Sequence, residues 1–164
     1  MLRWIAVLAL VAACGCGRSS PAPEVKVSKF QLDTGAGAPR VGVAMAVPPA
    51  WHVDPEGPEF VVPGVDGGMI SLAALDLKGT DVERMTVAIA MQFGEGERAA
   101  DEQRRELPGG RVWIERKELR MVHARIFVPY PRGVVMGVAL VPHAAAARVD
   151  EIRKVFETLT IDGP

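Results

Sequence analysis

Few side chains in this sequence combine the residue types and the spacing that catalysis or metal binding requires. Its three histidines are His52, His123 and His143, and none belongs to an HExxH-type pair on a predicted helix. Asp54 and Glu59 flank His52, so a carboxylate–histidine site stands beside the simpler interpretation of a surface histidine next to a tryptophan. No serine lies in a G-x-S-x-G turn, and no glycine cluster forms a dinucleotide or phosphate loop. We therefore expect no catalytic residue, no metal site and no cofactor.

The residue whose chemistry the sequence does predict is Cys14. The uncharged apolar run Trp4–Ala13 follows Arg3 and ends in the small residues Val11-Ala12-Ala13, directly before this cysteine. A basic start, a short apolar core and a small-residue exit are the parts of a secretory signal peptide. The run is shorter than the roughly 20 apolar residues that a bilayer-spanning helix needs.

With a cysteine directly after the small residues, this segment resembles the lipobox signal of bacterial lipoproteins. The resemblance implies that residues 1–13 are removed, that Cys14 receives a diacylglycerol on its sulfur, and that its new amino end is acylated. Residues 14–24, which are small, polar and proline-containing, are expected to form a flexible tether. Gly15 in place of an aspartate implies transport to the outer membrane, with the domain facing the periplasm. Ordinary secretion, an uncleaved membrane anchor and lipidation of Cys16 instead are the alternatives.

The composition limits the classes of partner. A formal net charge of −1 provides no basic face for nucleic acid and no polybasic patch for anionic lipids, so membrane attachment depends on the lipid anchor. No cysteine follows Cys16, so the domain must be stable through packing without disulfides. The partners we expect are the membrane, through the lipid, and a protein of the envelope.

Residues 25–164 predict a single α+β domain with a mostly antiparallel sheet. The expected strands and short extended pieces are Val25–Asp33, Val41–Val47, Trp51–Val53, Glu59–Val62, Met69–Leu77, Arg111–Glu115, Leu119–Val128, Val134–Val141 and Leu159–Asp162.

Three further segments have distinct patterns. Large apolar residues alternate with small ones in Arg84–Phe93, and this period of two predicts another strand. The polar segment Gly96–Leu107 predicts a short surface helix that ends at Pro108. Apolar residues recur at helical spacing in Ala144–Glu157, which predicts a long C-terminal helix packed on one face of the sheet.

The segment Val47-Pro48-Pro49-Ala50-Trp51-His52-Val53 resembles the strand–proline–tryptophan opening of the PsbP superfamily. That group includes extrinsic photosystem subunits, a Ran-binding import factor and bacterial lipoproteins. The closing hairpin, the long helix and the short strand to Ile161 are also similar to that family, whose motif has a glycine where this chain has Ala50. The resemblance covers Val41 to Ile161. It implies a PsbP-like sandwich and a non-enzymatic adaptor or accessory domain.

A candidate partner surface lies on one face of the strand Leu119–Val128. Its residues are of types enriched in binding hot spots, and they face away from the predicted core set. They are Met121, His123, Arg125 and Phe127, with Trp113 expected beside them on the neighbouring strand. The alternative is that one of the helices covers this face and makes it a second core layer.

Two functions follow as hypotheses. The first is a lipid-anchored, non-enzymatic envelope protein that binds a protein partner or supports an envelope complex. The second is a carrier or sensor of a small ligand, with an apolar pocket between sheet and helix. That pocket would be lined by methionines, namely Met69, Met85, Met91, Met121 and Met136.

Overall fold

The structure, a computed structural model, describes residues 25–35, 38–54, 57–94 and 101–162. Residues 1–24, which include the predicted lipobox with Cys14 and the predicted tether, lie outside the described residues. No helix in the described part of the chain is long and apolar enough to cross a membrane.

Two antiparallel sheets contain the strands of the described residues. The smaller sheet has the order β1-β2-β10, with β1 (Lys26–Leu32), β2 (Val41–Val47) and β10 (Thr160–Ile161). The larger has the order β3-β4-β5-β9-β8-β7-β6. Its strands are β3 (His52–Val53), β4 (Glu59–Val61), β5 (Met69–Asp76), β6 (Glu102–Leu107), β7 (Arg111–Glu118), β8 (Met121–Tyr130) and β9 (Gly133–Pro142). The α+β class and the antiparallel sheet are as predicted from the sequence.

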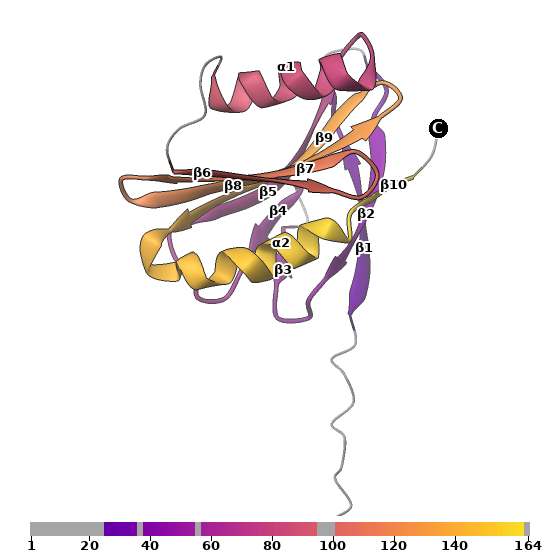
Figure 1. Cartoon of the computed structure of the whole chain (residues 1–164). Helices are drawn as coiled ribbons and strands as arrows, with labels where there is room; N and C mark the ends of the chain where they lie inside the picture. Colours follow the sequence, from indigo (N-terminus) through magenta and orange to yellow (C-terminus); the bar gives the residue numbers. More distant parts are fainter. Residues whose placement is uncertain (1–24, 36–37, 55–56, 95–100, 163–164) are drawn as a thin grey trace, which may run out of the picture.

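The larger sheet lies between two helices (Figure 1). Helix α1 (Asp81–Phe93) covers one face, and α2 (Val149–Glu157) packs on the other together with the smaller sheet. A 3₁₀ segment, η1 (His143–Arg148), precedes α2 and has no side-chain cap. The predicted C-terminal helix is therefore α-helical only in its second part and shorter than expected.

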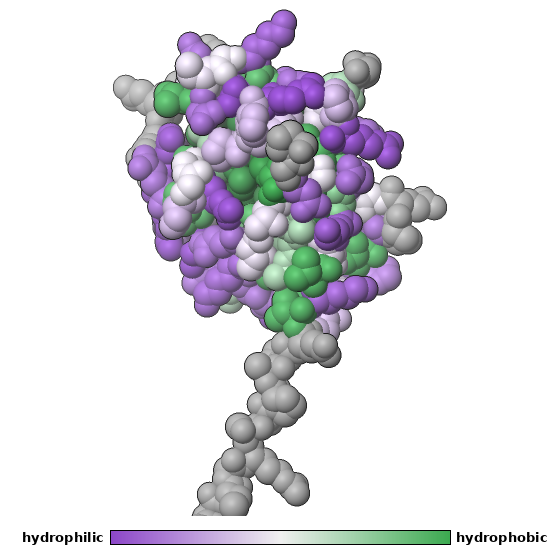
Figure 2. All heavy atoms as spheres, turned by 90° about the vertical axis from the view of Figure 1, so that its right-hand side faces the viewer, coloured by the Kyte–Doolittle hydropathy of each residue, from purple (hydrophilic) through white to green (hydrophobic). Residues whose placement is uncertain are grey.

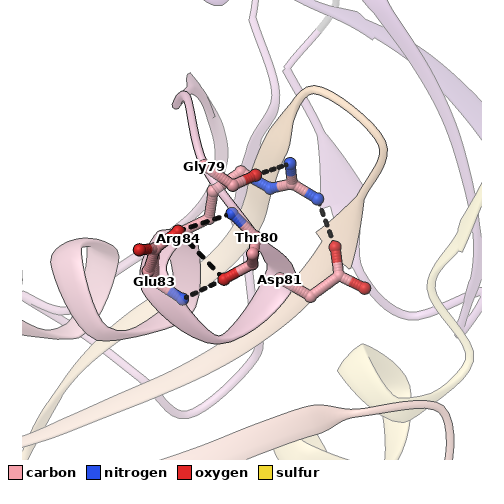
Figure 3. Close-up of polar contacts among 5 residues, drawn as sticks. All are labelled: Gly79, Thr80, Asp81, Glu83 and Arg84. Carbon is pink, nitrogen blue, oxygen red and sulfur yellow. Dashed lines mark hydrogen bonds and ion pairs between the residues drawn. The ribbon is translucent and has the colours of Figure 1, made fainter.

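The strand predicted at Arg84–Phe93 is wrong, because this segment lies within α1. A capping box begins the helix (Figure 3): the amide of Glu83 donates to Thr80 Oγ1 (3.4 Å), and the amide of Thr80 donates to Glu83 Oε2 (2.8 Å). Arg84 closes the same turn by donating to the Gly79 carbonyl (2.6 Å) and pairing with Asp81. The alternating apolar residues fit a helix because some of them face the sheet and others face outward.

The helix predicted at Gly96–Leu107 is also wrong over the residues that the structure describes there. Glu102–Leu107 forms β6, which pairs with β7 from Glu102 opposite Arg116 to Leu107 opposite Arg111, whereas residues 95–100 lie outside the described part. Glutamate, glutamine, arginine and leucine are good helix formers, but cross-strand pairing overrides that weak preference. The ion pair from Arg116 Nη2 to Glu102 Oε2 (2.8 Å) is one such cross-strand contact.

The two faces of the larger sheet belong to two separate cores. The larger core joins the sheet to α2 and the smaller sheet, and it includes the fully buried Trp113, Ile126 and Phe156. Gly137 is required here, because a Cβ at this position would lie 2.8 Å from the Phe156 ring. The smaller core, between the sheet and α1, includes Phe127 and Ile114.

Candidate functional site

The side chains on the α1 face of the larger sheet stand in rows across the strands. One row runs across one end of the sheet through Glu102, Arg116, His123, Leu140 and Met69. The next row inward contains Arg104, Ile114, Arg125, Val138 and Ser71. The sheet extends beyond the C-terminal end of α1 (Figure 1), so part of this face is left uncovered and Met69 is 42% exposed.

The predicted partner surface does not exist as one exposed strip. Trp113 is buried on the opposite face, because it pairs with Ile126 while its neighbour Ile114 pairs with Arg125. Arg125 and Phe127 do share the predicted face, but they are buried at α1. The prediction of exposure is therefore wrong for Trp113, Arg125 and Phe127.

Met121 and His123 are the two predicted residues that stay partly exposed on that face. His123 Nε2 lies 3.4 Å from Glu118 Oε2. Met121 and His123 line a shallow hollow at the turn between β7 and β8, where Leu119 is fully exposed. Their part in binding a partner stays a prediction.

Two arginines meet the last residue of α1. The guanidinium carbons of Arg116 and Arg125 lie 4.9 and 4.6 Å from the centre of the Phe93 ring, within cation–π distance. Arg116 also donates to the Phe93 carbonyl (3.4 Å), and Arg125 Nε donates to Gln92 Oε1 (3.1 Å). We call Phe93, Arg116 and Arg125 the arginine cluster.

The arginine cluster is a buried site with excess positive charge. Arg125 is only 8% exposed and makes no ion pair with any described residue, and its Nη1 atom has no hydrogen-bond partner there. Burial lowers the pKa of Arg125; the Glu118 carboxylate opposes this effect and the charge of Arg116 adds to it. Such a cluster can attract a carboxylate, because a buried cation without a counter-ion carries an uncompensated desolvation cost.

Two apolar side chains one turn apart on α1 face solvent. Val87 and Met91 are 45% and 60% exposed, and we call these two residues the α1 surface; Val82 is 77% exposed but lies on the opposite side of the helix from Met91. Val87 and Met91 also line a hollow of about 550 Å³ that reaches Arg104 on β6. The sequence prediction missed this surface because it assigned the segment to a strand. The sequence pattern that predicts the start of this helix is the Thr80-x-x-Glu83 capping box.

The region around His52, where the sequence allows a carboxylate–histidine site, has contacts of the kind that hold a fold together. His52 is exposed on β3, while Trp51 is buried edge-on against Phe60 and its Nε1 donates to Glu151 Oε1 (3.4 Å). Trp51 therefore links the start of β3 to α2. No group of three or more histidine, cysteine or acidic side chains in the described ranges is placed to hold a metal ion.

The methionines do not gather around one pocket. Met85 and Met136 belong to the smaller core, Met91 lies on the outer side of α1, and Met121 lies at the β7–β8 turn. The hypothesis of a ligand carrier therefore gains no support from their positions.

Comparison with known proteins yields one likeness in structure and none in sequence. No protein-family model matches the chain, and no curated protein sequence matches it. Among solved structures, it is similar to the solution structure of cyanobacterial PsbP (CyanoP) from Synechocystis sp. PCC 6803. The TM-score is 0.47 at 10% identity, covering 90% of this chain and 99% of that chain. A likeness of this size carries no argument about activity, ligand or partner.

Proposed function

We propose that this chain is a lipid-anchored, non-enzymatic accessory protein of the bacterial cell envelope, and that it binds a protein partner through the α1 surface. The exposure of Val87 and Met91, which lie one turn apart on α1, is the observation that carries the proposal. A surface helix normally turns polar residues to solvent, and neighbouring exposed apolar side chains mark interaction sites. The partner buries these two side chains and removes them from water.

The charges around α1 define the chemistry of that partner. Asp81 and Glu83 lie in the first turn, whereas Arg104 of β6 lines the hollow that contains Val87 and Met91. An apolar segment with an acidic residue near the C-terminal end of α1 would match this polarity. Electrostatic complementarity of this kind contributes more to orientation and association rate than to raw affinity.

The position of α1 is compatible with anchoring through Cys14 in the outer membrane. Strand β1 begins at the lower end of the molecule in Figure 1, whereas α1 lies at the top. A domain attached through the residues before β1 thus has its α1 surface at the far end, where a periplasmic partner can reach it. The proposal includes that the sandwich is of the PsbP-like type.

The anchor is tested by metabolic labelling of the full chain in a Gram-negative host with an alkyne fatty acid. We expect label in the wild type and in Cys16→Ala, and loss of label in Cys14→Ala together with transfer of the protein to the aqueous phase of a detergent extraction. Label that depends on Cys16 instead would move the anchor to that residue. An unlabelled wild type would overturn the lipoprotein proposal.

Partner binding is tested by site-specific photocrosslinking in the envelope of the host. A photoreactive residue at position 91 should form one defined heteromeric product, and a second substitution, Val87→Glu, should abolish that product. The matched control places the probe at Lys154, an exposed residue of α2 on the other face of the sheet. Equal products from positions 91 and 154, or a product insensitive to Val87→Glu, would contradict the proposal.

A further inference from the structure

The sulfur atoms of the described residues belong to methionines alone. Both cysteines, Cys14 and Cys16, precede the described part of the chain. Where no thiolate is present, a methionine thioether is the sulfur group that oxidants such as hypochlorous acid or hydrogen peroxide attack. The exposure of each methionine therefore decides which of them an oxidant reaches first.

Met91 is the most exposed methionine among the described residues. It is 60% exposed, against 42% for Met69, whereas Met85 of the same helix is 8% exposed and belongs to the smaller core. Because Met85 and Met91 are six positions apart on α1, their side chains lie on different sides of the helix. Helix α1 thus carries one accessible thioether and one protected thioether. The other described methionines are less exposed, namely Met45, Met121 and Met136.

Other exposed apolar surface of the described residues does not share this chemistry. Apart from Met69 and Met91, the exposed large apolar residues there are valines and one leucine. Figure 2, viewed from the side of the smaller sheet, shows apolar surface at the lower end of the molecule, where Val25 and Val27 are 52% and 62% exposed. These hydrocarbon side chains offer no sulfur lone pair to an oxidant. The α1 surface differs from that lower surface because transfer of one oxygen atom can make it polar.

Oxidation of Met91 changes the chemistry of the α1 surface. Hypochlorous acid transfers its oxygen atom to a lone pair of the Met91 sulfur, which becomes a sulfoxide, and the chlorine leaves as chloride together with a proton. The sulfur loses two electrons and the chlorine gains them. Since the α1 surface consists of Val87 and Met91, one of its two apolar side chains becomes polar.

A sulfoxide at position 91 favours the free protein over the complex. In the free protein, water hydrates the sulfoxide oxygen, and Arg104 of β6 offers hydrogen-bond donors in the same hollow. In the complex, the apolar segment of the partner covers position 91 and offers no donor. The sulfoxide oxygen would then lose its water without gaining a hydrogen bond, which weakens binding.

The attachment of α1 to the sheet does not depend on Met91. Met85 and Ala88 are the helix residues buried in the smaller core, and the capping box at Thr80 fixes the start of the helix. Oxidation at position 91 leaves these contacts in place. Its effect therefore falls on partner binding and not on folding.

We propose that Met91 is a site of reversible oxidation, and that its sulfoxide releases the protein partner from the α1 surface. This inference rests on the proposed function of that surface, because without partner binding there is nothing to release. Methionine sulfoxide reductases restore the thioether. The oxygen leaves as water, and two thiols of the reducing system form a disulfide. Partner binding therefore returns after reduction.

The first measurement compares the two methionines of α1 in the purified full chain. Limited treatment with hypochlorous acid, followed by peptide mass spectrometry, should show the sulfoxide forming about tenfold faster at Met91 than at Met85, because oxidation follows exposure. The circular dichroism spectrum should not change. Similar rates at the two positions, or unfolding that Met91→Leu prevents, would overturn the proposal.

The second measurement follows partner binding by photocrosslinking from position 86 in the envelope of the host. Thr86 is exposed and lines the same hollow as Met91. Hypochlorous acid should lower the yield of the heteromeric product about tenfold, and reductases for both sulfoxide epimers should restore it. Met91→Leu keeps an apolar side chain without sulfur, so its product should survive the oxidant. Met91→Gln is polar without any oxidant and should give little product.

The outcomes separate this inference from the proposed function. A product that persists although mass spectrometry finds the Met91 sulfoxide would overturn the inference and leave the proposed function standing. Equal loss of product in Met91→Leu would assign the effect to another group and would also overturn the inference. Absence of any product from positions 86 and 91 in the untreated chain would overturn both.

Discussion

The two faces of the larger sheet differ in what their side chains do. On the α2 face, Trp113, Ile126 and Phe156 are fully buried in a continuous apolar core. On the α1 face, a smaller apolar core ends at the arginine cluster, and the covering helix exposes Val87 and Met91. The comparison indicates that the α2 face provides most of the stability, while the α1 face retains polar and exposed apolar groups that a stable core does not need. Four predictions test this division.

We expect the largest difference in the free energy of unfolding between alanine variants of two phenylalanines that cover the sheet. Phe156→Ala should lower the free energy of unfolding by about 3–5 kcal/mol, because it removes a fully buried ring from the core of the α2 face. Phe93→Ala should cost about 1–2 kcal/mol, since that ring is only partly buried. Urea denaturation followed by circular dichroism measures both. Equal costs would show that the two faces contribute alike.

The two arginines of the cluster should respond differently to removal of their charge. Arg116→Met takes away the guanidinium that pairs with Glu102, whose side chain is 7% exposed, and should cost about 2–3 kcal/mol. Arg125→Met removes a buried cation that has no carboxylate partner among the described residues, so stability should stay within about 1 kcal/mol of wild type. The same denaturation assay compares them. A larger loss for Arg125→Met would mean that its contacts with Phe93 and Gln92 outweigh its desolvation.

Close packing on the α2 face predicts that a larger residue at position 137 lowers the stability of the fold. Gly137→Ala should cost about 1–3 kcal/mol, because the added methyl meets the Phe156 ring and Ile126 at less than 3 Å. Phe156→Leu in the same chain should recover part of that loss relative to the sum of the single effects. Gly57→Ala is the control, since a Cβ there meets nothing within 4 Å. A double-mutant cycle on unfolding free energies measures the coupling, and additive effects would exclude it.

The smallest effect concerns the start of α1. Thr80→Ala should cost about 1 kcal/mol through loss of the capping box. Hydrogen bonds from the backbone and side chain of Thr80 lower the pKa of Glu83 below its ordinary value of 4.5. The stabilisation from Glu83 is therefore complete above pH 4.5 and lost as the pH falls through the lower, folded-state pKa.

The matching measurement is the free energy of unfolding between pH 7 and pH 3 for the wild type and Glu83→Gln. The wild type should lose more stability than the variant on acidification below about pH 4.5. Parallel curves would show that the carboxylate does not contribute to the helix start.

A sequence pattern predicts an element correctly when few structures fit that pattern. The hairpin β8–β9 was predicted well, because two apolar runs separated by the turn at 131–132 have few other solutions. The segment 84–93 was misassigned, because alternating apolar residues fit either a one-sided strand or a helix with apolar residues all round. The capping residue Thr80 distinguishes the two, and it lies outside the periodic segment.

The amino-acid sequence alone predicts the antiparallel α+β class, since period-two strands and short turns leave little freedom at that level. It also predicts Cys14 as the lipidation site from neighbouring residues alone. That Trp113 faces α2 depends on the register of β7 in the folded sheet, because a shift of one residue along a strand moves its side chain to the other face. That no described strand pairs with the outer edge of β1, or with β5 beyond the end of β4, also depends on tertiary structure.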